Sequence, residues 1–158
     1  MELKDAIAKR YSVRSYLDKK VDKELVKEIL EVSKRAPSGV NSQPWKIYVV
    51  MGDARDKLVN EACEKFDKGE LEKEEYQVYP TERPDWYKAR QRAAGFALYG
   101  AVGIGREDAD KRITQARKNY ELFGAPVGIF VTVHKSVGPN GWGPVSYTHL
   151  TLPTTPVV

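Results

Sequence analysis

The sequence has few of the side chains that bind metals or form disulfides. Its 158 residues include one cysteine, Cys63, and two histidines, His134 and His149. A single cysteine cannot form an intramolecular disulfide, and so few ligands make a cysteine- or histidine-based metal site unexpected. Cys63 falls on the apolar face of a predicted helix, which favours packing in the core over a role as a nucleophile.

Long apolar runs are also missing. No window approaches the ~18–20 apolar residues of a membrane span, and the first residues do not read as a secretory signal. The net charge of +4 is scattered, without a recognition helix or a basic stripe interleaved with aromatics. A hydrophobic content of 41% is typical of one globular domain. We therefore expect a cytoplasmic protein that binds neither membranes nor nucleic acid.

Charged side chains stop at Lys135, after which there is no Lys, Arg, Asp or Glu. From Ser146 onward the sequence has neither helical nor strand periodicity, and it resembles translated adaptor or cloning sequence fused to a shortened reading frame. We expect residues 1–144 to form the domain and residues 145–158 to be a non-native or disordered tail. A natural disordered tail is the alternative.

Apolar periodicity predicts most of the regular structure. Helical spacing recurs in five stretches, near residues 3–10, 23–34, 53–66, 93–101 and 107–123. Asp22 is the expected N-cap of the second helix. Residues 47–51 and 127–133 predict strands, and the first should be buried on both faces because polar residues do not alternate in it.

The loop between the second predicted helix and the first strand is rich in polar groups. Pro37 stops the helix, and Gly39 allows the main chain to approach a ligand closely. Small polar side chains follow at Ser38, Asn41, Ser42 and Gln43. The alternative is an ordinary helix-to-strand connection, in which these residue types are common.

A second polar stretch places Arg10, Ser12 and Arg14 at alternate positions. In an extended segment these side chains project to one side, where two guanidinium groups and a hydroxyl suit a phosphate. The alternative is a basic surface strand in a chain with 26 Lys and Arg residues.

In order and spacing, the two stretches resemble the nitroreductase family of FMN-dependent enzymes. Residues 123–130 also resemble this family's entry into a core strand, so the resemblance covers about residues 2–144. It implies an α+β fold, with a central, mainly antiparallel sheet flanked by helices in a three-layer α/β arrangement. The fold would be incomplete at the C-terminus, which makes residues 1–144 a partial FMN-binding domain.

The resemblance also implies an FMN site shared by the two subunits of a homodimer. Its cofactor contacts would come from Arg10, Tyr11, Ser12, Arg14, Pro37, Ser38, Gly39, Val40, Asn41 and Gln43. The arginine segment would hold the phosphate and ribityl end, and the loop would lie against the ring or ribityl side. Because the cofactor carries the chemistry, no catalytic protein residue is expected.

The implied activity is electron transfer from NAD(P)H through FMN to nitroaromatic, quinone or similar small-molecule acceptors, by a ping-pong mechanism. The sequence does not distinguish NADH from NADPH as the electron donor. Alternatives on the same site are a flavin-dependent dehalogenase, a flavin-modifying enzyme or a non-catalytic flavin-binding module. The aromatic stretch at residues 76–87 is either a surface excursion or a lid over the flavin.

Overall fold

The structure, a computed structural model, describes residues 2–70 and 79–137. They fall into two compact units, one from residues up to 59 and from 122 onward, the other from residues 60–121. The predicted tail, residues 145–158, lies outside the described residues, as do residues 76–78 of the aromatic stretch. The expectations for these segments remain predictions.

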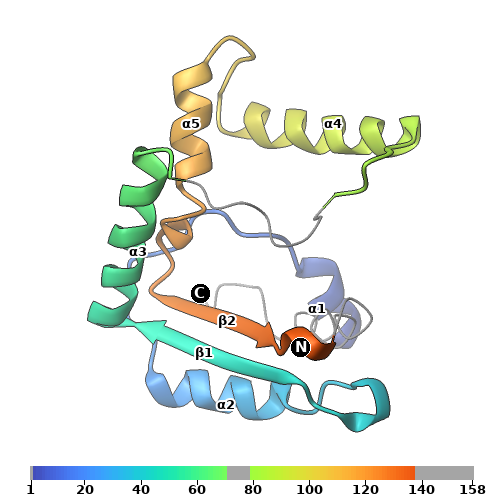
Figure 1. The fold of residues 1–158 in the computed structure, drawn as a ribbon, viewed down its shortest axis with the longest axis vertical. Coiled ribbons are helices and arrows are strands. Elements are labelled where there is room, and N and C mark those ends of the chain that lie inside the picture. Colours follow the sequence, from blue (N-terminus) through green and yellow to red (C-terminus); the bar gives the residue numbers. More distant parts are fainter. Residues whose placement is uncertain (1, 71–78, 138–158) are drawn as a thin grey trace. The chain divides into compact units, whose positions relative to one another are not determined.

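The first unit is built on a two-stranded antiparallel sheet. Strand β1 (Trp45–Met51) pairs with β2 (Val127–Val133), with Trp45 opposite Val133 and Met51 opposite Val127 (Figure 1). Both strands lie where the apolar runs predicted them. Gly128 is buried, and a Cβ there would come within 2.9 Å of a Val50 methyl carbon, so this position of the ladder has no room for a side chain.

Strand β1 is not buried on both faces, and that prediction is wrong. Tyr48 is 55% exposed, and its partner across the ladder, Phe130, is 39% exposed. Tyr48 and Phe130 lie on the same face because residues directly opposite in an antiparallel pair share a face. Leu122 packs against this face at Gly128, but Tyr48 and Phe130 stay exposed, which apolar composition alone cannot reveal.

Helix α1 (Leu3–Lys9) opens the first unit, and α2 (Lys23–Ser33) leads to the polar loop. The Asp22 carboxylate accepts a 2.9 Å hydrogen bond from the backbone N–H of Glu24, which confirms the predicted N-cap. Val26 and Ser33 are buried, and the Ser33 hydroxyl donates to the Ile29 carbonyl at 2.7 Å. The buried hydroxyl is therefore satisfied inside its own helix.

The entry into β2 is a tight turn, η2 (Leu122–Gly124), with left-handed backbone angles at all three residues. The Phe123 carbonyl accepts a 3.2 Å hydrogen bond from the Tyr16 N–H. Helix α3 (Gly52–Asp67) contributes Arg55, whose Nε donates to the Ala125 carbonyl at 3.0 Å. The start of α3 and the segment after Arg14 are thus both tied to the start of β2.

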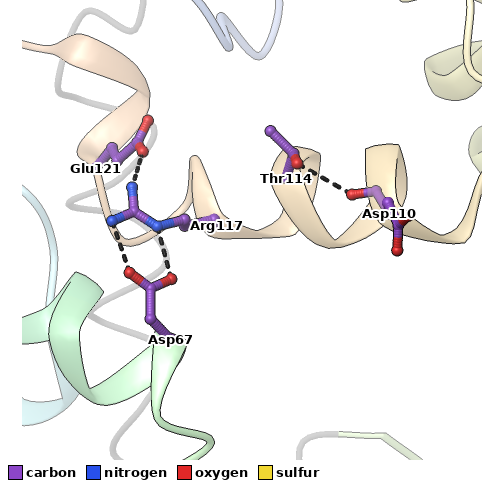
Figure 2. Close-up of polar contacts among 5 residues, drawn as sticks. All are labelled: Asp67, Asp110, Thr114, Arg117 and Glu121. Atoms are coloured by element: carbon purple, nitrogen blue, oxygen red, sulfur yellow. Dashed lines mark hydrogen bonds and ion pairs between the residues drawn. The ribbon is translucent and has the colours of Figure 1, made fainter.

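The second unit contains α4 (Asp85–Ala101), α5 (Ala109–Arg117) and the end of α3. Arg117 donates two hydrogen bonds to the Asp67 carboxylate, from Nε to Oδ1 at 2.8 Å and from Nη2 to Oδ2 at 2.9 Å (Figure 2). It also forms an ion pair with Glu121. Phe66 packs on Tyr120 with ring centres 4.8 Å apart. Cys63 is buried, as its place on the apolar helix face predicted.

The fifth helix is shorter than the periodicity predicted. It ends at Arg117 rather than near residue 123, and Ile113 is exposed although it was expected on the buried face. The positive backbone angles at Leu122 and Phe123 are incompatible with a continuing right-handed helix. The ion pair of Arg117 with Asp67 holds the last turn in place.

We expect the Asp67–Arg117 pair to stabilise the fold at neutral pH and to lose its effect in acid. The hydrogen bond from Arg117 lowers the pKa of Asp67, despite a smaller opposing effect of desolvation. A lowered pKa stabilises the fold above the unfolded-state pKa of about 4, and the contribution is lost as pH falls through the folded-state pKa. Thermal unfolding of wild type and Asp67→Asn should therefore differ at pH 7, and the difference should shrink as the pH is lowered below about 4.

The matched control for this series is Asp18→Asn, which removes an exposed loop carboxylate of the first unit. Its difference from wild type should stay small across the same pH range. An unfolding difference between wild type and Asp67→Asn that is constant from pH 7 to pH 2.5 would contradict the assignment.

Candidate functional site

The arginine segment follows α1 without regular secondary structure. Arg10 has extended backbone angles, φ −67° and ψ 128°, and it ends the helix. Arg10, Tyr11, Ser12 and Arg14 are all exposed, whereas Val13 is half-buried. Within residues 2–70 and 79–137, no carboxylate pairs with either arginine, so both guanidinium groups are open to an anion.

The polar loop is organised around Ser38. Its hydroxyl accepts a 3.0 Å hydrogen bond from the Gln43 N–H, and its carbonyl accepts one of 3.0 Å from the Asn41 N–H. The Ser42 N–H donates to the Gly39 carbonyl, and the Gln43 amide donates to the Asn41 side chain at 3.1 Å. These bonds hold the short turn η1 (Gly39–Asn41) and fix the direction in which the loop presents its polar groups.

Three residues without glycine's freedom adopt left-handed backbone angles in this loop. The φ values are +48° at Val40, +54° at Asn41 and +44° at Gln43. Asn tolerates this region, but a β-branched residue rarely does, and such strain costs on the order of 1–3 kcal/mol. Val40 is also 100% exposed, so no packing within its own chain offsets the strain. Strain kept at a side chain that gains no packing from it points to a functional loop.

The sequence-predicted residues fit the two ends of a flavin mononucleotide. Two guanidinium groups and a hydroxyl suit its phosphate, because the donors are charged, forked and unpaired. Beside the exposed Gly39, a Cβ would meet no atom within 4 Å, so the main chain is open to a planar ring. The loop itself offers the Asn41 and Gln43 amides and the half-buried Ser38, next to exposed Pro37.

The two groups of predicted residues lie in the same unit but do not touch through polar contacts. Among the described residues, no hydrogen bond or ion pair joins the arginine segment to the loop. The predicted set also leaves out Ser42, which closes the turn, and Tyr16, which anchors the arginine segment. Ser42 was present in the motif, whereas a backbone N–H such as that of Tyr16 gives no signal in the sequence.

Neither a metal centre nor a membrane span emerges from the part of the chain that the structure describes. There, no three His, Cys, Asp or Glu side chains are grouped closely enough to hold a metal ion. None of the helices in these ranges combines the length and apolar character that crossing a bilayer requires.

The α+β fold of this chain is shared by proteins with solved structures. The structure of the FMN and NADPH-dependent nitroreductase NfnB from Sphigopyxis sp. strain HMH superposes on 96% of this chain and 69% of its own, with a TM-score of 0.89 and 36% identity. The sequence pattern of the nitroreductase family matches residues 7–150. The chain therefore belongs to the nitroreductase family.

Curated relatives agree with this family. A 4-nitrobenzoate reductase from Nocardioides sp. (strain LMS-CY) is 40% identical over 86% of this chain and 57% of its own length. A nitrobenzene nitroreductase from Ectopseudomonas oleovorans is 35% identical over 83% of this chain and 58% of its own. The chain thus spans less than three fifths of the length of these relatives.

Replacing Val40 by glycine should make the flavin-free protein more stable. Glycine removes a left-handed penalty of about 1–2 kcal/mol and costs about 0.5–1 kcal/mol through the greater entropy of the unfolded chain, so we expect a net gain of up to about 1.5 kcal/mol. FMN affinity should fall at the same time if the side chain contacts the cofactor. Chemical denaturation and FMN titration measure the two effects.

Val40→Ala is the matched control, because it keeps a Cβ and removes only the branch. We expect the variant with glycine at position 40 to be the most stable, the variant with alanine to be intermediate, and the wild type with valine to be the least stable. If Val40→Gly is less stable than wild type and binds FMN equally well, neither the strain nor its link to the cofactor holds.

Proposed function

We propose that this chain is the FMN-binding part of an enzyme that passes electrons from NAD(P)H to nitroaromatic small molecules. The observation that carries the proposal is the pair of exposed arginines, Arg10 and Arg14, in a family member that also holds a strained polar loop on its surface. Support comes from the relatives, which are named as reductases of 4-nitrobenzoate and nitrobenzene, and from NfnB, an FMN and NADPH-dependent enzyme.

Each group of residues has a separate task in this proposal. Arg10, Ser12 and Arg14 bind the phosphate, with Tyr11 beside them. Pro37, Ser38 and Gly39 lie along the ring or ribityl side, and Val40 contacts the ring face. The amides at Asn41 and Gln43 complete the polar contacts of the loop. FMN itself, when bound, accepts and releases the electrons, so the chain has to bind, orient and shield it rather than supply a nucleophile.

A site shared by the two subunits of a homodimer agrees with the exposure of both groups and with the lack of polar contacts between them. Each group is exposed, and within the described residues no polar contact joins them in one protomer. If one subunit contributes the arginines and the other the loop, dimerisation completes the site. The proposal includes ping-pong turnover, quinones as further acceptors, and a cytoplasmic location.

We expect Arg14→Ala to weaken FMN binding by about tenfold to a hundredfold. A hydrogen bond to a charged group contributes about 1.5–3 kcal/mol, and each 1.4 kcal/mol is a factor of ten in affinity. The FMN affinity of Arg14→Lys should lie between those of wild type and Arg14→Ala, because an ammonium keeps the charge but not the forked geometry. Quenching of FMN fluorescence on titration with protein gives the dissociation constants.

Lys19→Ala is the control, since Lys19 is another exposed cation a few residues further along. It should bind FMN as wild type does. Equal losses in Arg14→Ala and Lys19→Ala would mean that net charge, not a phosphate site, governs binding.

The activity itself is tested by the visible spectrum of the FMN-loaded protein without oxygen. NADPH should bleach the flavin bands, and a nitroaromatic added after the nicotinamide is removed should restore them. A protein that binds FMN but is not bleached by NADPH or NADH would be a flavin-binding module and not an enzyme.

A further inference from the structure

The start of α4 carries two arginines stacked on aromatic rings. The Arg90 Cζ lies 5.2 Å from the centre of the Trp86 ring, and the Arg83 Cζ lies 5.3 Å from the centre of the Tyr79 ring. Tyr87 meets the Trp86 ring edge-on, with centres 5.9 Å apart and planes at 70°. All five residues belong to the second unit. We refer to them as the aromatic–arginine cluster.

The two arginines of the cluster differ in their polar contacts. Arg83 is half-buried and donates to the Pro80 carbonyl and the Gln91 side-chain oxygen, each at 3.3 Å. Arg90 is exposed, and among the described residues its contact is the stacking on Trp86. Its charged N–H groups are therefore available to a ligand, whereas those of Arg83 are engaged in holding the loop before α4.

Among the residues that the structure describes, no carboxylate pairs with Arg90. Asp85, the acidic residue in the first turn of α4, pairs with Lys88 at 3.7 Å. Trp86 is 60% exposed, so a flat apolar surface and a guanidinium without a carboxylate partner among the described residues lie side by side in solvent.

This pairing selects for a ligand with a particular chemistry. A guanidinium stacked on an indole keeps the donors at its edge free, and a carboxylate can accept two of them at once. The exposed part of the indole offers stacking to an aromatic ring. We propose that Trp86 and Arg90 form a recognition site for aromatic carboxylates, which binds anionic nitroaromatics in preference to neutral ones.

A nucleic acid would need a different arrangement of charge. Around the helix, Lys88 and Arg92 lie about 40° apart on one face, whereas Arg90 lies about 160–200° away from both, so the three cations form no single continuous stripe. A small ligand that needs one guanidinium and one ring matches the cluster better than a polyanion does.

The binding experiment uses the full chain without FMN and needs no turnover. The probes are 4-nitrobenzoate and its neutral methyl ester, compared by isothermal titration calorimetry. We expect the acid to bind about fivefold to tenfold more tightly, the preference to disappear in Arg90→Ala, and both probes to bind more weakly to Trp86→Leu. Arg92→Ala is the matched control, with the same lost charge elsewhere on α4, and it should keep the preference.

Three results would overturn the site. The first is that wild type binds the acid and the ester with equal affinity, and the second is that Arg90→Ala and Arg92→Ala lose the preference for the acid equally. The third is that a single-stranded oligonucleotide displaces 4-nitrobenzoate at a lower concentration than the methyl ester does. Far-UV circular dichroism of each variant checks that α4 is retained, so a loss of fold is not mistaken for a loss of binding.

The turnover experiment separates this inference from the proposed function. In the FMN-loaded protein, reduction of either acceptor tests the proposed function, whereas the binding preference for the acid and its loss in Arg90→Ala test the aromatic carboxylate site. Reduction of both acceptors together with equal binding of acid and ester would keep the proposed function and overturn the site. Selective binding of the acid without any reduction would overturn the proposed function and keep the aromatic carboxylate site.

Discussion

The antiparallel pairing of β1 with β2 is the constraint on which the first unit depends. It joins residues 45–51 to residues 127–133, which are far apart in the chain, and its register fixes where each neighbouring segment begins. The polar loop enters β1 directly, and the turn before β2 receives the Tyr16 N–H and the Arg55 guanidinium. A slip of one residue would move every strand side chain to the opposite face and displace these anchors with it. Both halves of the proposed cofactor site are therefore held by one ladder.

The polar loop combines firm hydrogen bonding with unfavourable backbone angles. Four bonds among Ser38, Gly39, Asn41, Ser42 and Gln43 over-determine its shape. That excess lets the chain keep Val40 in a conformation that valine rarely adopts. In a connection with no task beyond joining a helix to a strand, glycine at this position would be more stable. The strain is therefore best explained by what the side chain contacts in the assembled protein.

Sequence patterns that act over a few positions predicted this structure better than they predicted features that depend on distant residues. The Asp22 cap, both strands and the burial of Cys63 follow from residue types that act within a few positions. The end of α5 and the exposure of Tyr48 do not, because they depend on residues distant in sequence or on what covers a sheet face. For the candidate site, the sequence located both segments on the surface. It could not reveal the left-handed Val40, since a β-branched residue argues against that conformation.

The arginines of this chain divide according to their partners, and the division bears on function. Arg117 has two carboxylate partners, which raise its pKa further above its ordinary value, and it joins the ends of two helices. The hydrogen-bond donors of Arg117 are therefore occupied, and its role is to stabilise the fold. Arg14 and Arg90 are exposed, and within the described ranges neither has a carboxylate partner. An exposed guanidinium contributes little to the free energy of folding, so its donors are available to a ligand. Arg14 shares an exposed segment with the hydroxyl of Ser12, which suits a phosphate. Arg90 stacks on the indole of Trp86, which suits an aromatic carboxylate.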